Sequence, residues 1–400
     1  DCGINAGSFP YPQLCEVTMS VVEMSVPDNK RSRLAAAIMN TLQFAGRITD
    51  LLIQEGAPVK VKTTSGIHTL EELNLPVHNF IVTLEDIQNF FSSYVQSGSV
   101  AKSATETWET VVMPEFAKKR PINRSIKTPG KEYLRFTLLQ QGRGRVAMVI
   151  RVTTPPPELD KLGLDQALVT KLKAGVRGLL IITGPTASGK TATALSILEW
   201  LNHHSSGHIV TVEDPIEYIM EPVHCAFTQR EVGFDVATFG DGLRDALRQA
   251  PDCILASEIR DRETAEAAIY GGEAGALMIV TTHGTSIAGT LRKMVALTGD
   301  GASTAMRGVL AGSLIGVVRQ ELVPRKDESG FIMVCDTLRD TDNVRRALER
   351  GDWHALEGIC NVATPSADFS PLSATVNRLV ADRSIGLEQG QAILAAQNRR

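Results

Sequence analysis

The chain has 400 residues, 43% of them hydrophobic and 22% charged, which is enough for two or three domains with sizeable cores. Its 41 basic and 45 acidic residues leave a net charge of −4, which argues against a bulk electrostatic partner such as nucleic acid or an anionic membrane. The six cysteines form no C-x-x-C pair, which argues against a disulfide framework or a cysteine zinc site and favours a reducing compartment.

The first 29 residues form an N-terminal segment whose pattern predicts no function. Neither this segment nor the rest of the chain contains the roughly 18 consecutive apolar residues of a membrane span, and the amino terminus lacks a signal-peptide pattern. We therefore expect a cytoplasmic protein without a direct membrane span, whose contact with a membrane goes through a partner.

Residues 30–152 are predicted to form an α+β domain. The runs RLAAAIMNTLQFA and EDIQNFFSSYVQS have helical periodicity, whereas VKVKT, YLRFTLLQ and RVAMVIRV are strand-like. The last two runs predict a hairpin turning at Gly142 and Gly144, because glycine accepts a positive φ without a side-chain clash. Arg143 would then lie at the hairpin tip.

Residues 153–163, TTPPPELDKLG, contain three consecutive prolines and are the predicted stiff linker. In residues 164–335 the strand-like runs GLLIIT, HIVTV, CILAS and ALMIVTT alternate with helical segments, which indicates a parallel sheet flanked by helices. From about Asp300 onward the sequence reads mainly as helices, apart from FIMVCD, and residues 336–400 are predicted to be a helical C-terminal region.

The stretch GPTASGKT, residues 184–191, fits the phosphate-binding pattern G-x-x-x-x-G-K-[ST] between a strand and a helix. Backbone N–H groups and the amino end of the helix would hold the phosphates of ATP. We expect Lys190 to reach the β- and γ-phosphates and the Thr191 hydroxyl to ligate Mg²⁺. The alternative is a glycine-rich turn that only links strand to helix. The predicted nucleotide-binding residues are Gly184, Pro185, Thr186, Ala187, Ser188, Gly189, Lys190, Thr191 and Ala192.

Ligands of open α/β sheets gather at the carboxyl ends of the strands, and three predicted strands deliver a polar residue there. HIVTV is followed by Glu213, CILAS by Glu258 and ALMIVTT by His283. A carboxylate can orient and deprotonate the attacking water or hold the Mg²⁺ shell, and a neutral imidazole can sense the γ-phosphate. Each residue alone is more often a capping, solvated or satisfied side chain, but three at the ends of one sheet predict a catalytic site.

Three further stretches carry a family resemblance. HIVTVEDPIEYI resembles the aspartate box, RDALRQAPDCILASEIRDRETAEAA the Walker B region and GGEAGALMIVTTHGTS the histidine box of the secretion-ATPase superfamily. This superfamily includes PilT-like retraction, type II secretion and VirB11-like ATPases. The similarity is dense from about residue 135 to residue 320, and NVRRALERG, residues 343–351, looks like a diverged helix of retraction-type members.

The resemblance implies a homohexameric ring whose subunits join a PAS-like amino-terminal domain to a RecA-like P-loop ATPase domain. It further implies that ATP is held at the seam of these domains and that Arg135, Arg143 and Arg151 complete the site. A guanidinium at a hairpin tip also suits the transition-state charge on the γ-phosphate, although a solvated basic hairpin is the alternative for each arginine. The implied partner is an inner-membrane platform or secretion-channel protein, which places the ring at the cytoplasmic face of the inner membrane.

Two positions depart from the family pattern. Ala276 stands where a histidine usually follows the glycine of the histidine box, and Ser257 stands where the Walker B strand usually has glycine. The paired-cysteine zinc module of extension-type ATPases is absent, which points to retraction-type members or to DotB- and TraJ-like type IVB secretion and conjugation members.

The leading hypothesis is a hexameric Mg-dependent ATPase motor of a type IV pilus, conjugation or type IV secretion machine. In it, Glu258 polarises the water and Glu213 helps to position water and metal. One alternative is an ATP-binding ring that acts as a scaffold or gated docking module with little hydrolysis, supported mainly by Ala276. Another is a RecA-like DNA motor, which the acidic net charge and the lack of a basic-aromatic stripe weaken, so we do not expect a nucleic-acid partner. The sequence does not decide whether the motor would serve a pilus, a conjugation apparatus or a secretion system, or in which direction it would do work.

Overall fold

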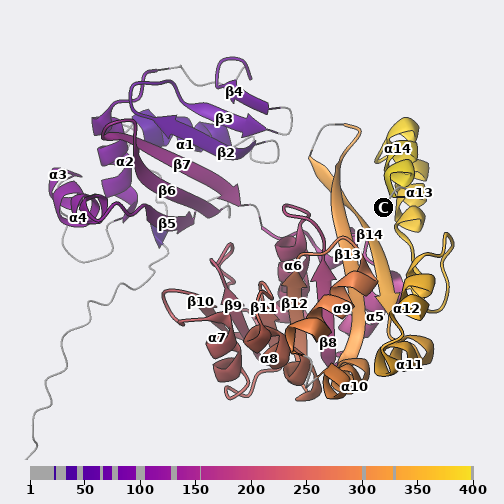
Figure 1. Cartoon of the computed structure of the whole chain (residues 1–400). Coiled ribbons are helices and arrows are strands. Elements are labelled where there is room, and N and C mark those ends of the chain that lie inside the picture. The colour runs from indigo at the N-terminus through magenta and orange to yellow at the C-terminus, as the bar shows by residue number, and fades with distance from the viewer. Residues whose placement is uncertain are drawn as a thin grey trace, which may run out of the picture. The chain divides into compact units, whose positions relative to one another are not determined.

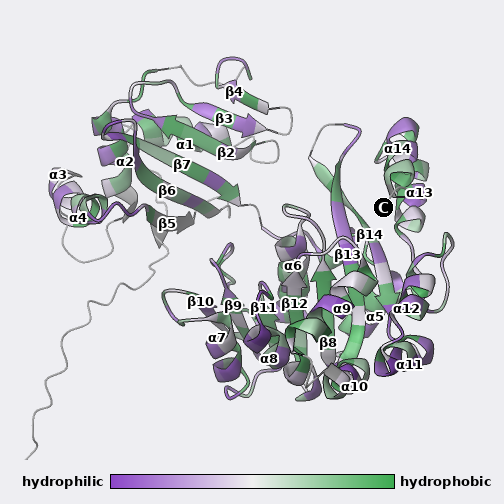
Figure 2. Ribbon diagram, viewed as in Figure 1, coloured by the Kyte–Doolittle hydropathy of each residue, from purple (hydrophilic) through white to green (hydrophobic). Residues whose placement is uncertain are grey.

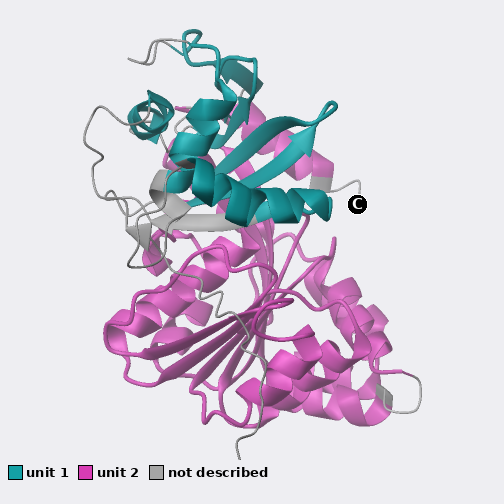
Figure 3. Cartoon of the chain, turned by 90° about the vertical axis from the view of Figure 1, so that its left-hand side faces the viewer, with its two compact units in different colours: residues 1–152 teal, residues 153–400 magenta. Residues whose placement is uncertain are grey.

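The chain folds into two compact units, residues 1–152 and residues 153–400 (Figure 3). The structure is a computed structural model of the whole chain, and each unit is described by itself. The predicted N-terminal segment, residues 1–29, lies outside the described residues except for one two-residue strand. The described residues are 22–23, 33–42, 48–63, 66–73, 80–95, 104–127, 133–153, 155–299, 303–327 and 330–397.

The N-terminal unit is a sheet covered by helices (Figure 1). Among its described residues, seven strands pair in the order β1-β5-β6-β7-β2-β3-β4. The strands are β1 (Val22–Glu23), β2 (Ile48–Gln54), β3 (Lys60–Thr63), β4 (Gly66–Thr69), β5 (Ile122–Lys127), β6 (Tyr133–Gln141) and β7 (Arg145–Thr153). The helical elements are α1 (Arg33–Leu42), α2 (Leu84–Val95), α3 (Ala104–Thr107), a π-helical turn (Trp108–Val112) and α4 (Met113–Ala117).

Aromatic side chains join the helices of this unit to its sheet. Phe90 and Phe91 of α2 meet Phe136 of β6 edge to face, and Trp108 packs between Phe91 and Phe116 in the same geometry. Phe90, Phe91 and Phe136 are fully buried, so this cluster is the centre of the core. Aromatic pairs of this kind contribute beyond their buried area, which stabilises α2 against the sheet.

Strands β6 and β7 form the predicted hairpin. Its turn is Gly142, Arg143 and Gly144, with φ angles of 48°, 69° and 96°. The two glycines take these angles without strain, and Arg143 follows them into the left-handed region. The α+β character and the hairpin expected from the sequence are confirmed.

The C-terminal unit is built on a sheet of eight strands among its described residues, in the order β10-β9-β11-β12-β8-β13-β14-β15. The strands are β8 (Gly178–Thr183), β9 (His208–Glu213), β10 (Ala226–Glu231), β11 (Cys253–Ala256), β12 (Leu277–Thr282), β13 (Leu314–Pro324), β14 (Phe331–Arg339) and β15 (Phe369–Ser370). The strands from β10 to β13 in this order run parallel, and β14 and β15 are antiparallel additions. The carboxyl ends of the parallel strands therefore meet at one edge.

Helices cover both faces of this sheet, as the continuous apolar run of β8 requires. Leu180 and Ile182 point into a core shared with α5 (Gln166–Lys173) and α6 (Lys190–His204). Leu179 and Ile181 point the other way, into a core shared with six further helices. Those helices are α7 (Phe239–Ala246), α8 (Arg262–Glu273), α9 (Ile287–Leu297), α10 (Ser303–Ser313), α11 (Asp342–Arg350) and α12 (Trp353–Cys360). In Figure 2 hydrophobic colours follow β8, whereas the outer helix α11 (Asp342–Arg350) is hydrophilic.

The structure corrects the sequence prediction at four places. Residues 314–324, expected among helices, form β13, because its first seven residues are buried between neighbouring strands and favour a sheet interior. β10 was not expected. The predicted boundary at residues 335/336 falls inside β14, so the sheet continues into the region expected to be helical. The predicted linker also ends in a 3₁₀ turn (Leu159–Lys161) that buries Leu159 in the core.

The remaining helices follow the sheet. They are α11, α12 (Trp353–Cys360), α13 (Leu372–Ala381) and α14 (Leu387–Gln397). Val323 and Val334 of the β13–β14 hairpin pack with Leu372, Val376 and Leu379 of α13 in a small separate core. None of the described helices is long and apolar enough to cross a membrane.

Gly178→Ala should lower the melting temperature of the C-terminal unit by about 5 °C or more. Gly178 has a φ of 129°, and an added Cβ would lie 2.3 Å from the carbonyl oxygen of Ser313. Gly308→Ala in α10 is the control, since its Cβ meets nothing within 4 Å and alanine favours a helix. Thermal unfolding followed by circular dichroism measures both, and equal melting temperatures for the two variants would contradict this packing.

Candidate nucleotide-binding and catalytic site

The predicted phosphate-binding loop lies between β8 and α6. Gly184 follows the buried strand directly, and an added Cβ there would lie 2.3 Å from the carbonyl oxygen of Gln320 on β13. Only glycine permits this close approach. Residues 185–187 form the exposed tip of the loop, and α6 begins at Lys190. The loop therefore presents its backbone and the amino end of a 15-residue helix at the carboxyl edge of the sheet.

Lys190 folds back onto its own loop. Its Nζ donates to the carbonyl oxygens of Gly184 (3.1 Å) and Pro185 (2.8 Å). Burial is the main cause that lowers the pKa of Lys190, and the carboxylate of Glu258 opposes this shift. The Thr191 hydroxyl, at the next position, belongs to a partly exposed residue. The ammonium group is thus held at the loop by two neutral acceptors.

Gln320 holds the other side of the same loop. Its Nε2 donates to the carbonyl oxygen of Ser188 at 2.7 Å, although Gln320 lies 132 residues further along the chain. Among the described residues, the buried Ser188 Oγ and Gln320 Oε1 have no hydrogen-bond partner. Two buried polar atoms without partners at a phosphate-binding loop fit a polar ligand there.

The carboxyl ends of β11 and β12 bring Glu258 and His283 together. His283 Nε2 lies 3.4 Å from Glu258 Oε1, and Arg260 Nη2 lies 2.6 Å from Glu258 Oε2. Arg260 also reaches Asp214, after β9, at 3.2 Å. The hydrogen bond from Arg260 is the main cause that lowers the pKa of Glu258, with His283 and Lys190 contributing. Glu258 is therefore ionised near neutral pH.

Glu213 has a different environment. It is fully buried, and its Oε1 accepts hydrogen bonds from Thr211 Oγ1 (2.7 Å) and Gln229 Nε2 (3.2 Å). Its Oε2 has no partner among the described residues. Burial raises the pKa of Glu213 to about 7. Glu213 is the last residue of β9 and Glu258 comes two residues after β11, and of the two carboxylates only that of Glu258 is partly exposed.

The two departures from the family pattern occupy different edges of the sheet. Ser257 Oγ accepts a hydrogen bond from the backbone N–H of Asp214 at 3.3 Å, so it joins the ends of β9 and β11. Ala276 is buried before the amino end of β12, where its carbonyl accepts from Gly178. Ala276 and His283 are separated by the length of β12, roughly 20 Å. Ala276 is therefore remote from the carboxyl edge.

The three predicted arginines belong to the N-terminal unit. Arg135 on β6 and Arg151 on β7 alternate with buried neighbours, so they lie on the sheet face away from the aromatic core. Arg151 Nε pairs with Asp50 Oδ1 at 3.0 Å, and Arg143 is exposed at the hairpin turn.

Sequence reasoning missed Arg260 and Gln320 as members of the site. Arg260 stands two residues after Glu258 in SEIRDRET, and this short spacing was an available signal. The sequence contains no such signal for Gln320, because the role of this residue depends on β13 lying next to β8.

Comparison with known proteins identifies the family. Residues 135–352, more than half of the chain, match the family model described as type II/IV secretion system protein. The chain belongs to this family. Type II/IV secretion system proteins related to it include the type IV pilus ATPase PilU of Pseudomonas aeruginosa, 34% identical over 270 residues, which are 66% of this chain and 70% of PilU.

Further similarities agree with this membership. The type IV pilus retraction ATPase PilT of Pseudomonas aeruginosa is 34% identical over 56% of this chain and 64% of its own length. A crystal structure of the pilus retraction motor PilT with bound ADP matches 88% of this chain and 94% of that one, with a TM-score of 0.70 and 27% identity. The ATPase DotB of Legionella pneumophila, 20% identical, matches 94% of this chain and 99% of its own with a TM-score of 0.72, which shows a common fold. The predicted α/β P-loop fold class and superfamily are thus confirmed.

The pH dependence of thermal stability should reveal the raised pKa of Glu213. Its pKa is raised from 4.5 to about 7 in the folded chain, so the contribution of its protonated form to stability is present below pH 4.5 and is lost as the pH rises through 7. The loss is on the order of 3 kcal/mol. In nucleotide-free protein, the melting temperature of wild type relative to Glu213→Gln should fall across this window. The exposed Glu273→Gln variant should show no such trend, and a constant difference for Glu213→Gln would contradict the assignment.

Proposed function

We propose that this chain is an ATP hydrolase and the motor subunit of a type IV pilus or a related secretion machine. The observation that carries the proposal is the meeting of a phosphate-binding loop with Glu258 and His283 at one edge of a parallel sheet. Ligands of such sheets bind at this edge. Family membership supports the same activity.

The residues present fit a nucleotide. A cradle for phosphate oxygens is formed by the amino end of α6, Gly184 and Ser188: Gly184 has no room for a Cβ, and Ser188 Oγ has no hydrogen-bond partner within the described part of the chain. Lys190 would exchange the carbonyl oxygens of Gly184 and Pro185 for phosphate oxygens. The Thr191 hydroxyl would hold Mg²⁺, which when bound supplies positive charge beside the phosphates.

Glu258 is the proposed general base. It is ionised because Arg260 lowers its pKa, and its side chain is partly exposed at the edge where water can reach it. His283, 3.4 Å away, would orient this carboxylate. Because Glu213 is fully buried, we propose that it keeps the strand ends aligned and does not itself contact water or metal.

The arginines and the assembly complete the proposal. Arg135, Arg143 and Arg151 would supply positive charge to the nucleotide in a homohexamer. The ring would act on an inner-membrane platform or channel protein from the cytoplasmic face. PilU and PilT are named as pilus ATPases, which supports this placement.

Glu258→Gln should lower ATP turnover at least about 100-fold while leaving the affinity for ATP within about twofold, because the amide cannot accept a proton. Steady-state phosphate release and a binding titration with Mg-ATP measure the two quantities. Glu263→Gln, at an exposed carboxylate that pairs with Arg244, is the matched control and should keep full turnover. Wild-type turnover in Glu258→Gln would rule out this base. ATP binding without turnover even in wild type would favour the scaffold alternative.

Arg143→Gln should lower kcat about tenfold or more with a smaller change in ATP affinity, because a guanidinium acts mainly on the charge of the transition state. Arg145→Gln is the control, since Arg145 is also exposed and begins β7 just after the same turn. Equal losses in the two variants would indicate that the hairpin contributes only general positive charge.

A further inference from the structure

Arg319 connects three segments of the C-terminal unit. Its side chain is only 5% exposed and lies on β13, directly opposite Asp336 of β14. Nε donates to the backbone carbonyl of Thr285 at 2.6 Å, and Nη1 donates to Asp336 Oδ2 at 2.7 Å. Nη2 donates to Glu321. A planar guanidinium can serve all three acceptors at once, whereas an ammonium group cannot match this fork.

The first contact reaches the catalytic edge. Thr285 is two residues after His283, and the next residue, Ser286, caps α9 by accepting from the backbone N–H of Gly289. Arg319 itself is in register with Thr183, the last residue of β8 before the phosphate-binding loop. The guanidinium of Arg319 on β13 therefore holds the loop between β12 and α9 through its hydrogen bond to Thr285.

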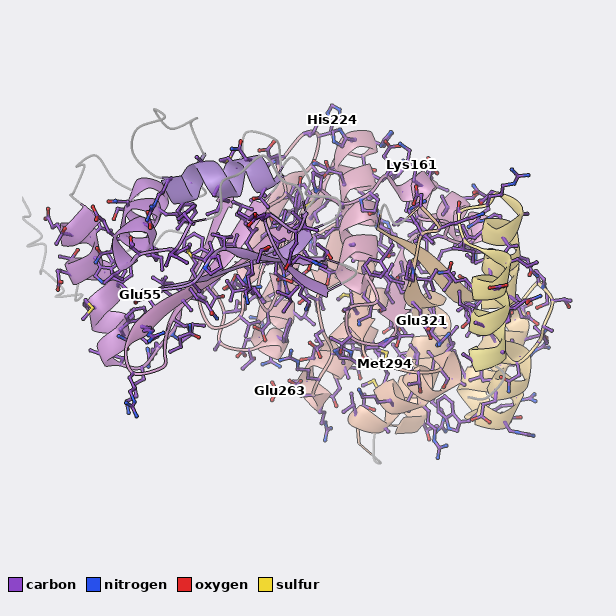
Figure 4. All side chains as sticks on the ribbon, turned by 90° about the horizontal axis from the view of Figure 1, so that it is seen from above. Glu55, Lys161, His224, Glu263, Met294 and Glu321 are labelled. Atoms are coloured by element: carbon purple, nitrogen blue, oxygen red, sulfur yellow. The ribbon has the colours of Figure 1, made fainter. Side chains whose placement is uncertain are left out.

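The second contact reaches the C-terminal helices. Asp336 Oδ1 accepts from the backbone N–H of Leu372, the first residue of α13, at 2.7 Å, while its Oδ2 accepts from Arg319. One carboxylate thus joins the amino end of α13 to the arginine. Helix α14 does not bond Arg319 in the same way: a cavity of about 320 Å³, lined by Arg319, Glu321, Gln389 and others, separates them. Figure 4 labels Glu321, one of these lining residues.

We propose that Arg319 is a positioning residue that ties the His283 loop to the amino end of α13, so that the position of this helix sets the placement of His283 beside Glu258. The inference rests on the proposed function for its catalytic consequence, but the tie itself is a property of the fold. Burying a charge of this kind is costly unless all its partners are in place, which makes the contact sensitive to movement of α13.

Arg339 offers a matched control. Like Arg319, it pairs with a carboxylate and bonds a backbone carbonyl. Its Nε and Nη2 pair with Asp165 at 3.0 and 2.6 Å and its Nη1 donates to the carbonyl oxygen of Ser366, while its side chain is 22% exposed. It stands on β14 in the same unit and touches neither His283 nor its loop. Arg339→Lys therefore reproduces the loss of an arginine–carboxylate pair without affecting the proposed tie.

The test compares amide hydrogen exchange, followed by mass spectrometry, in the full-length Arg319→Lys and Arg339→Lys variants. Loss of the Thr285 contact should speed exchange in peptides covering residues 284–290 about fivefold or more. Arg339→Lys should leave these peptides unchanged. Unchanged exchange in Arg319→Lys, or equal acceleration throughout the unit in both variants, would overturn the proposal. Asp336→Asn, which keeps an acceptor for Leu372, serves as a second variant and should speed the same peptides.

Turnover separates this inference from the proposed function. Arg319→Lys should lower kcat while KM for ATP stays within about twofold, and in a His283→Gln background it should lower kcat no further. Additive losses would show that Arg319 does not act through His283. If wild type hydrolyses no ATP, the proposed function fails, while the exchange experiment still decides whether the tie exists.

Discussion

The parallel order of the strands is the constraint on which the rest of the C-terminal unit depends. Because β9, β11, β12, β8 and β13 run in the same direction, their carboxyl ends deliver residues far apart in the sequence to one edge. The phosphate-binding loop, Glu258 and His283 meet there for this reason alone. Gln320 and Arg319, adjacent on β13, then hold the phosphate-binding loop and the His283 loop respectively.

Two carboxylates at this edge show how burial assigns different roles to the same group. Glu258 is partly exposed, and Arg260 keeps it ionised, so it can accept a proton at neutral pH. Glu213 is sealed beneath the edge between Thr211 and Gln229, and burial raises its pKa to about 7. A carboxylate of this kind is suited to structural alignment, and its protonation couples the strand ends to pH.

The sequence was sufficient for elements whose signals are local. The apolar run of β8 followed by GPTASGKT, and the glycines around Arg143, specified a strand, a phosphate-binding loop and a hairpin without any knowledge of distant contacts. The sequence failed for β13, because a buried strand and a buried helix share the same apolar composition until the neighbouring strands are known. The sequence placed Glu213 at the end of β9 but not its depth: the predicted role with water and metal stays a prediction, whereas the full burial of this side chain is visible only in the fold. The roles of Gln320 and Arg319 depend on the placement of β13 and could not be predicted without it.

The binding mode proposed for this edge is that the loop holds the phosphates of a nucleotide through Lys190. Calorimetric titration of wild type and Lys190→Ala with ATP in the presence of Mg²⁺ tests it most directly. Wild type should bind saturably, and the variant should lose about 100-fold or more in affinity for ATP, with both proteins equally folded. Equal affinities for the two proteins would contradict this binding mode, because the nucleotide would then bind elsewhere or without the ammonium group.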